Sequence, residues 1–298
     1  MGWKTFAVIG IVAYFVYQSI DRFDPASIKD KRVVITGAST GIGEEIAYHY
    51  ARFGARILIT ARREAVLKQV VAKCKELGAK EAFYVPLDMA QEEAPKTLID
   101  EAQKKFGGLD HLILNHIINT YPKFWEGEFD SVMKKTMDIN FYAYIRLATH
   151  ATPMLKKSNG HIGVVSSGAG KIGLPFVAVY SASKFALHGF FDALRQEYEM
   201  QNFGISISTF VLGGINTTTV AQDTTKIFLP QTFSTTPYDT ALRIIKGTAN
   251  REREVYYPFQ AFQITKMRDF APVLMERIIQ SQTLNQDTIS KILKSRGE

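Results

Sequence analysis

The chain has 298 residues, 46% of them hydrophobic and 22% charged, a balance typical of a folded protein and not of a disordered one. Its single cysteine, Cys74, excludes an intramolecular disulfide and disfavours both a disulfide-stapled fold and a cysteine-based metal site. The net charge of +7 is spread along the chain without a long basic run, which disfavours nucleic acid as a partner.

An uncharged apolar segment, residues 6–17 (FAVIGIVAYFVY), lies near the amino terminus. Its length is typical of the apolar part of a signal peptide or of a signal anchor. A helix buried in the domain is disfavoured, because the segment precedes the first predicted strand and ends in a polar linker containing proline. Because small residues are missing at plausible cleavage positions, we favour a signal anchor over residues 1–22 with a linker over residues 23–31. A cleaved signal peptide is the alternative.

From Lys31 onward, short apolar runs alternate with amphipathic stretches. The predicted strands are residues 32–36, 56–60, 82–85, 109–114, 161–166, 205–211 and 254–257. The predicted helices are residues 43–53, 64–77, 91–106, 132–154 and 179–201. This alternation predicts an α/β fold with a doubly wound parallel sheet covered on both faces.

We expect one catalytic domain over residues 32–265, followed by a helical segment over residues 266–298. Within that segment, residues 271–280 (APVLMERIIQ) form an amphipathic pattern. Such a helix could contact a partner or a membrane surface, or it could pack on its own domain.

The first predicted strand runs directly into a glycine-rich turn and then into a helix. Glycines permit a tight turn and close approach of a pyrophosphate, whose charge the amino end of the helix favours. The pattern therefore predicts a dinucleotide site, with a tight turn that holds no ligand as the alternative. Its residues are Gly37, Ala38, Ser39, Thr40, Gly41, Ile42 and Gly43.

The end of the second predicted strand selects between NAD and NADP. Arg62 and Arg63 stand there, with no carboxylate before Glu64. Because a guanidinium grips a phosphate with two charge-assisted hydrogen bonds, we favour NADP(H). Alternatively, the two arginines simply begin a solvated helix. Asp88, after the third strand, could bond the adenine ring or serve as the N-cap of the next helix.

Three residues predict acid–base chemistry. Tyr180 and Lys184 are four residues apart in a helical stretch, so both lie on one face of the helix. A lysine ammonium beside a phenol lowers the phenol pKa and makes it a useful catalyst. Ser167 ends a strand and can orient a substrate oxygen toward Tyr180.

These motifs, in this order and spacing, resemble the short-chain dehydrogenase/reductase family over residues 30–260, approximately: TGASTGIG, an asparagine motif after the fourth strand, Asn140, Ser167, Tyr180 and Lys184. Within it, the chain most resembles the group of 11-beta-hydroxysteroid dehydrogenase type 1 and its type 1-like relatives. The segments that carry this closer likeness are residues 23–27, 44–50, 112–117, 180–191, 211–213 and 254–257.

The resemblance implies a Rossmann-fold oxidoreductase, a homodimer or homotetramer, that moves a hydride between NADP(H) and a carbonyl/alcohol pair on a lipophilic substrate, a steroid above all. Asn140 would hold a water that relays protons to Lys184. The implied cofactor contacts beyond the glycine loop and the arginines are Asp88, Met89, Asn115, His116, Ile117, Tyr180, Lys184, Ile215, Asn216, Thr217, Thr218 and Thr219.

The basic residues after the apolar segment favour a cytosolic domain, but the resemblance instead implies anchoring in the endoplasmic reticulum membrane with the domain in the lumen. Secretion after cleavage is the alternative. A retinoid or xenobiotic carbonyl is the alternative substrate. A non-catalytic cofactor-binding scaffold is disfavoured, because the serine, tyrosine and lysine are all present.

Two positions depart from the family pattern. Thr40 stands where NADP-preferring relatives often have a basic residue, which leaves cofactor selection to the two arginines. Asn216 begins a glycosylation sequon, which we interpret as unused because it falls in the expected cofactor lid. His116, His150 and His161 lack ligand-spaced partners, so we interpret them as structural residues and expect no metal site.

Overall fold

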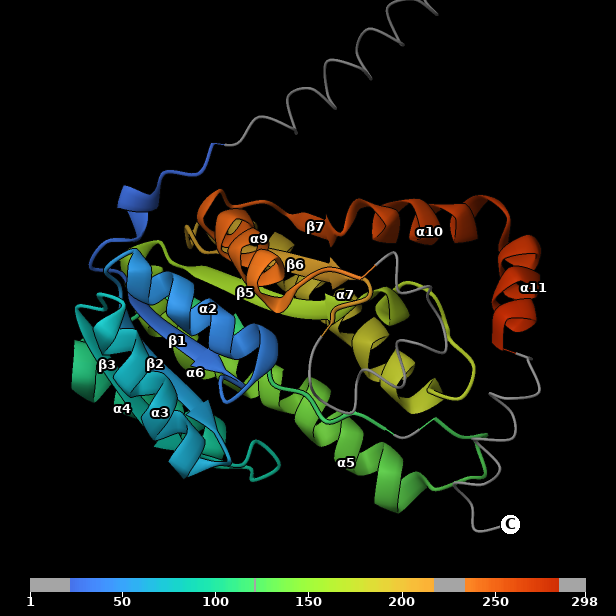
Figure 1. Cartoon of the computed structure of the whole chain (residues 1–298), viewed down its shortest axis with the longest axis horizontal. Coiled ribbons are helices and arrows are strands. Elements are labelled where there is room, and N and C mark those ends of the chain that lie inside the picture. The colour runs from blue at the N-terminus through green and yellow to red at the C-terminus, as the bar shows by residue number, and fades with distance from the viewer. Residues whose placement is uncertain (1–21, 121, 217–233, 284–298) are drawn as a thin grey trace, which may run out of the picture.

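The computed structural model describes residues 22–120, 122–216 and 234–283, which form a parallel seven-stranded sheet between two layers of helices (Figure 1). The strand order is β3-β2-β1-β4-β5-β6-β7. The strands are β1 Arg32–Thr36, β2 Arg56–Ala61, β3 Glu81–Pro86, β4 His111–Leu114, β5 His161–Ser167, β6 Ser206–Leu212 and β7 Glu254–Tyr257. The predicted doubly wound sheet is confirmed. The apolar amino-terminal segment lies outside the described residues.

The strands are apolar because both faces of the sheet are covered. One face packs against α2 (Gly41–Arg52), α3 (Glu64–Glu76) and α9 (Pro237–Ala249), which lie in front of the sheet in Figure 1. The other face packs against α4 (Ala94–Phe106), α6 (Ala143–Ser158) and α7 (Ala178–Met200). Successive residues of β1 therefore enter different cores: Val33 and Ile35 the first, Val34 the second.

The helix predicted over residues 132–154 is a longer and less regular stretch. A π-helical turn (Phe129–Met133), the short α5 (Lys134–Met137) and a second π-helical turn (Asp138–Tyr142) lead into α6. The second π turn contains Asn140, and such turns are frequent at functional sites. The one extra residue per turn changes which side chains face the sheet, a shift that regular helical periodicity does not predict.

The sequence analysis missed α9. Its start has a recognisable signal: Thr236 Oγ1 accepts a hydrogen bond from the Asp239 amide at 3.0 Å, and Pro237 occupies the first turn. The helix packs against α2, and His49 Nε2 lies 3.1 Å from the Tyr238 carbonyl oxygen.

The chain continues beyond β7 into α10 (Phe259–Phe270) and α11 (Pro272–Thr283), so the expected boundary between residues 265 and 266 lies inside α10. The amphipathic segment predicted at residues 271–280 is helical from Pro272 onward, within α11. Phe270 at the end of α10 and Val273 and Leu274 in α11 are exposed. In the described parts of the chain, no helix has both the length and the apolar character needed to cross a membrane.

Candidate active site

The glycine loop joins β1 to α2 with almost no free space. Gly37 has a φ of +68°, and a Cβ there would lie 2.7 Å from the Cα of His116. A Cβ on Gly43 would collide with the Gly37 carbonyl oxygen. The N-cap residue of α2, Thr40, makes no side-chain capping bond among the described residues, so the first amides of the helix point into the loop unsatisfied by a side chain. This cradle fits a dinucleotide pyrophosphate.

Two residues after β4 hold the loop in this shape. The side-chain amide of Asn115 donates to the carbonyl oxygens of Thr36 and Gly37, at 3.1 and 3.2 Å. His116 Nε2 lies 3.0 Å from the Ile139 carbonyl oxygen, which only accepts, so Nε2 carries the proton and Nδ1 accepts from Thr36 Oγ1 at 2.8 Å. Burial lowers the pKa of His116 to about 3, which keeps the ring neutral. Both side chains therefore brace the loop.

Arg62 and Arg63 are exposed where β2 leads into α3. Arg63 Nη2 donates to the Ser39 hydroxyl at 3.1 Å, which directs this guanidinium to the glycine loop. Arg63 is also the N-cap residue of α3. Its backbone therefore begins a helix, as the alternative interpretation of the two arginines expects.

The residues after β3 correct one expectation. The alternative that Asp88 is the N-cap of the next helix is wrong, because α4 begins at Ala94 with Glu93 as its N-cap. Asp88 instead closes a turn, where its Oδ1 accepts from the Ala90 amide at 3.0 Å. The side chain of Met89 is buried in the core.

Ser167, Tyr180 and Lys184 meet at the carboxyl end of β5. The Ser167 hydroxyl accepts a hydrogen bond from the Ala169 amide at 3.2 Å, and Ser167 lowers the pKa of Tyr180. Lys184 is 1% exposed; its Nζ donates to the Val165 carbonyl oxygen at 3.0 Å and lies 5.8 Å from the centroid of the Tyr180 ring. One strand and one helix thus bring together three residues that are up to 17 positions apart in the sequence.

Burial opposes the charged forms of both titratable groups. It raises the pKa of Tyr180 to about 12, although Ser167 lowers it, and it lowers the pKa of Lys184 to about 7. Burial alone therefore disfavours both the phenolate and the ammonium.

Asn140 is fully buried and ties the segment after β4 to α7. Its Oδ1 accepts from the Ile118 amide at 2.8 Å, and its Nδ2 lies 3.0 Å from the Ile118 carbonyl oxygen and 3.3 Å from Ser183 Oγ. Ser183 directly precedes Lys184, so Asn140 lies beside the catalytic helix. The water relay implied for Asn140 stays a prediction.

The remaining predicted cofactor residues lie around the same edge of the sheet. Ile117 is 40% exposed, next to the braced pair after β4. Ile215 forms an isolated parallel bridge with Thr235, and the Asn216 amide donates to the Thr235 carbonyl oxygen at 2.8 Å. Thr217, Thr218 and Thr219 lie outside the described residues.

Sequence reasoning missed two groups at this site. Tyr144 on α6 is fully buried; its hydroxyl donates to the His116 carbonyl oxygen at 2.7 Å, and its ring centroid lies 5.6 Å from Lys184 Nζ. A small, mostly apolar hollow also lies against the first residues of α7, and its lining residues are Thr120, Lys123, Phe124, Trp125, Val132, Phe176, Val177, Ala178 and Val179. No spacing rule connects residue 125 to residue 179, so only the fold reveals this hollow.

The sequence profile of the short chain dehydrogenase family matches residues 31–227. The chain therefore belongs to this family of oxidoreductases, whose fold binds a nicotinamide cofactor. Its curated relatives include hydroxysteroid 11-beta-dehydrogenase 1-like proteins from Danio rerio, 44% identical over 88% of this chain and 91% of the relative, and from Xenopus tropicalis, 45% identical over 93% and 96%.

A solved structure shares the fold. An alcohol dehydrogenase from the archaeon Thermococcus sibiricus, complexed with 5-hydroxy-NADP, superposes with a TM-score of 0.66 and 23% sequence identity. The match covers 76% of this chain and 96% of the archaeal chain.

Proposed function

We propose that this protein transfers a hydride between NADP(H) and a carbonyl/alcohol pair on a lipophilic substrate, with a steroid as the preferred class. The observation that carries the proposal is the group at the end of β5: Ser167 acting on the pKa of Tyr180, with Lys184 buried one helical turn further along α7. This is an acid–base centre beside a cradle suited to a dinucleotide.

The cofactor supplies or accepts the hydride, and the chain handles the proton. In carbonyl reduction the Tyr180 hydroxyl donates its proton to the substrate oxygen, and in alcohol oxidation the phenolate accepts one. Ser167 donates a hydrogen bond that orients the substrate oxygen. The Lys184 ammonium stabilises the phenolate that forms during reduction.

Three observations support the finer assignments. A small apolar hollow against the first residues of α7 is lined by the rings of Phe124 and Phe176, with centroids 5.0 Å apart, and by the 47%-exposed Trp125, side chains that favour an apolar substrate. The curated relatives are named for a hydroxysteroid. For the cofactor, Arg63 reaches Ser39 from the end of β2, where a 2′-phosphate would meet the guanidinium.

Location and assembly extend the proposal. We propose that residues 1–22 anchor the protein in the endoplasmic reticulum membrane with the catalytic domain in the lumen, and that the enzyme is a homodimer or homotetramer. Carbonate extraction, protease protection of the domain in microsomes and sedimentation in detergent test these three statements.

The Tyr180→Phe variant tests the chemistry. Removing the hydroxyl should lower kcat by about 100-fold to 10,000-fold while NADPH affinity stays unchanged, because the ring still packs but no proton moves. The assay follows NADPH and NADH consumption in parallel against steroid, retinoid and small aromatic carbonyls. Turnover by the variant at the rate of the unaltered protein would refute the mechanism, and preference for a non-steroid carbonyl would refute the substrate class.

A further inference from the structure

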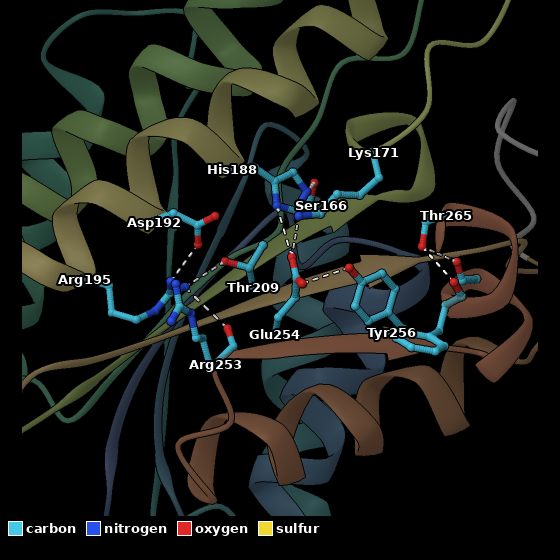
Figure 2. A network of polar contacts seen from close by, with 12 residues as sticks. Ser166, Lys171, His188, Asp192, Arg195, Thr209, Arg253, Glu254, Tyr256 and Thr265 are labelled. Carbon is cyan, nitrogen blue, oxygen red and sulfur yellow. Dashed lines mark hydrogen bonds and ion pairs between the residues drawn. The ribbon is translucent and has the colours of Figure 1, made fainter. Parts of the chain in front are cut away.

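A polar network includes Ser166, which directly precedes Ser167 in β5 (Figure 2). It joins Ser166 at the end of β5, Lys171 after the turn, His188 on α7 and Glu254 at the start of β7. None of these four residues belongs to the acid–base centre, and they come from β5, the segment after it, α7 and β7.

His188 is the centre of this network. Its Nε2 lies 3.0 Å from Ser166 Oγ, and its Nδ1 lies 3.6 Å from Glu254 Oε1, without a hydrogen-bond partner among the described residues. A carboxylate only accepts, so Nδ1 carries the proton and faces Glu254, while Nε2 accepts from the Ser166 hydroxyl. The ring is 6% exposed, so this orientation is fixed by its surroundings.

Burial keeps the His188 ring neutral. Burial, and after it the charge of Lys171, lower its pKa to about 4, with Lys184 acting in the same direction and Glu254 and Asp192 opposing them. A neutral ring leaves Nε2 free to accept, which the hydrogen bond from Ser166 requires.

Glu254 connects His188 to the far end of the turn. Lys171 Nζ lies 2.6 Å from Glu254 Oε1, and the Tyr256 hydroxyl donates to Oε2 at 2.8 Å. Burial raises the pKa of Glu254, but the contacts with Lys171 and Tyr256 lower it by more. The pKa therefore lies below its usual value, and the carboxylate stays charged. Figure 2 shows Lys171 and His188 on the same side of this carboxylate.

The turn after Ser167 is tightly packed at Gly170. It runs through Gly168–Gly170, and a Cβ on Gly170 would lie 2.9 Å from Ser166 Oγ and 3.0 Å from His188 Cδ2. The network thus holds the turn at Ser166 on one side and at Lys171 on the other, with Ser167 between the two attachments.

We propose that His188 is a positioning residue, which holds the Ser167 hydroxyl against Tyr180 through Ser166 and, by way of Glu254, through Lys171. The proposal rests on the proposed function, because it assigns a role relative to that acid–base centre. The proposal has one specific consequence. Ser167 lowers the pKa of Tyr180, so a turn that no longer holds Ser167 in place should raise that pKa.

The test compares two substitutions. His188→Phe keeps a ring of similar size without nitrogen atoms, and His188→Gln keeps an acceptor that can reach Ser166. For His188→Phe we expect the rise of alcohol oxidation with pH to move to higher pH, and kcat to fall roughly tenfold with KM for NADP unchanged. His188→Gln should restore most of both.

A matched control separates positioning from stability. His161→Phe alters the amino end of β5, the strand that carries Ser166 near its carboxyl end. There, His161 Nδ1 lies 2.7 Å from the Thr248 carbonyl oxygen. It should lower thermal stability without moving the pH profile. If His188→Phe does not fold, Lys171→Met at the partly exposed end of the network replaces it as the test variant. It should also move the pH profile of alcohol oxidation to higher pH.

A second readout needs no turnover. NMR titration of isotope-labelled tyrosine with NADP bound follows Tyr180 directly, with Tyr180→Phe identifying its signal. A higher titration midpoint in His188→Phe or Lys171→Met supports the proposal, and a midpoint equal to that of the unaltered protein overturns it. Failure of the proposed function appears separately, as equal turnover of Tyr180→Phe and the unaltered protein.

Discussion

At the scale of single residues, Tyr180 and Lys184 owe their chemistry to burial. The same low-dielectric surroundings raise the pKa of the phenol to about 12 and lower that of the amine to about 7. Burial therefore favours the neutral form of both groups. In the proposed mechanism, a charged Lys184 would stabilise the phenolate that Tyr180 forms during the reaction.

Lys184 also makes the stability of the protein depend on pH. Because its pKa falls from 10.5 to about 7 on folding, the unfolded chain binds more protons between these values. The penalty for burying Lys184 is complete below pH 7 and disappears as pH rises toward 10.5. Lys184→Met should therefore raise stability at pH 7 by a few kcal/mol, an advantage that shrinks toward alkaline pH. Urea unfolding of both proteins at pH values between about 7 and 10.5 measures the difference in stability. A difference that does not change with pH would contradict the lowered pKa of Lys184.

At the scale of elements, two helical glycines illustrate opposite constraints. Gly43 in α2 touches the glycine loop, whereas a Cβ on Gly189 in α7 would meet nothing within 4 Å. Helical propensity favours alanine at both positions. Packing decides the sign of the change, because only Gly43 has backbone and the Asn115 side chain against it.

The matched pair of substitutions follows from this contrast. Gly189→Ala should raise stability by about 0.5–1 kcal/mol. Gly43→Ala should lower it by about 1–3 kcal/mol and weaken NADPH binding, because the loop must open to accept the new methyl group. Thermal unfolding and NADPH titration of both variants measure the difference. Equal changes in stability would show that the loop can accommodate the added methyl group without opening.

Sequence patterns predicted most elements, with strand limits correct within two residues. The periodic signals are strong because every strand is buried on both faces. Asp88 and α9 show where such reasoning stops. A carboxylate before a helix reads as an N-cap, yet Asp88 closes a separate turn six residues before α4 begins. The π-helical turn at Asn140 is likewise decided by packing against α7.

At the scale of the whole molecule, the candidate site lies where the strand order reverses, between β1 and β4. Loops that leave neighbouring strands in opposite directions open a crevice there, at the carboxyl ends of the strands. The glycine loop, the braced pair after β4 and the centre at the end of β5 all lie along this edge. Ligand binding should therefore stabilise the domain as a unit.

Cofactor binding can be measured by this stabilisation. NADPH at a hundred times its Kd should add about 2.7 kcal/mol, which raises Tm by roughly 5–10 °C for a domain of this size. NADH at the same concentration should raise it less if Arg63 and Ser39 receive the 2′-phosphate. Arg63→Ala should abolish the difference between the two cofactors. Equal shifts in the unaltered protein would remove the basis for NADP preference.

Sequence patterns predicted the parallel fold, the glycine loop and the Ser167, Tyr180 and Lys184 group, because these depend on local periodicity and short spacing. The side chains that surround them come together only in the folded protein. His116 braces the loop, Arg63 turns to Ser39, and His188 meets Glu254 from a strand 66 residues away in the chain. Such contacts join strands and helices that pack together only after the sheet has formed, so no spacing along the chain encodes them.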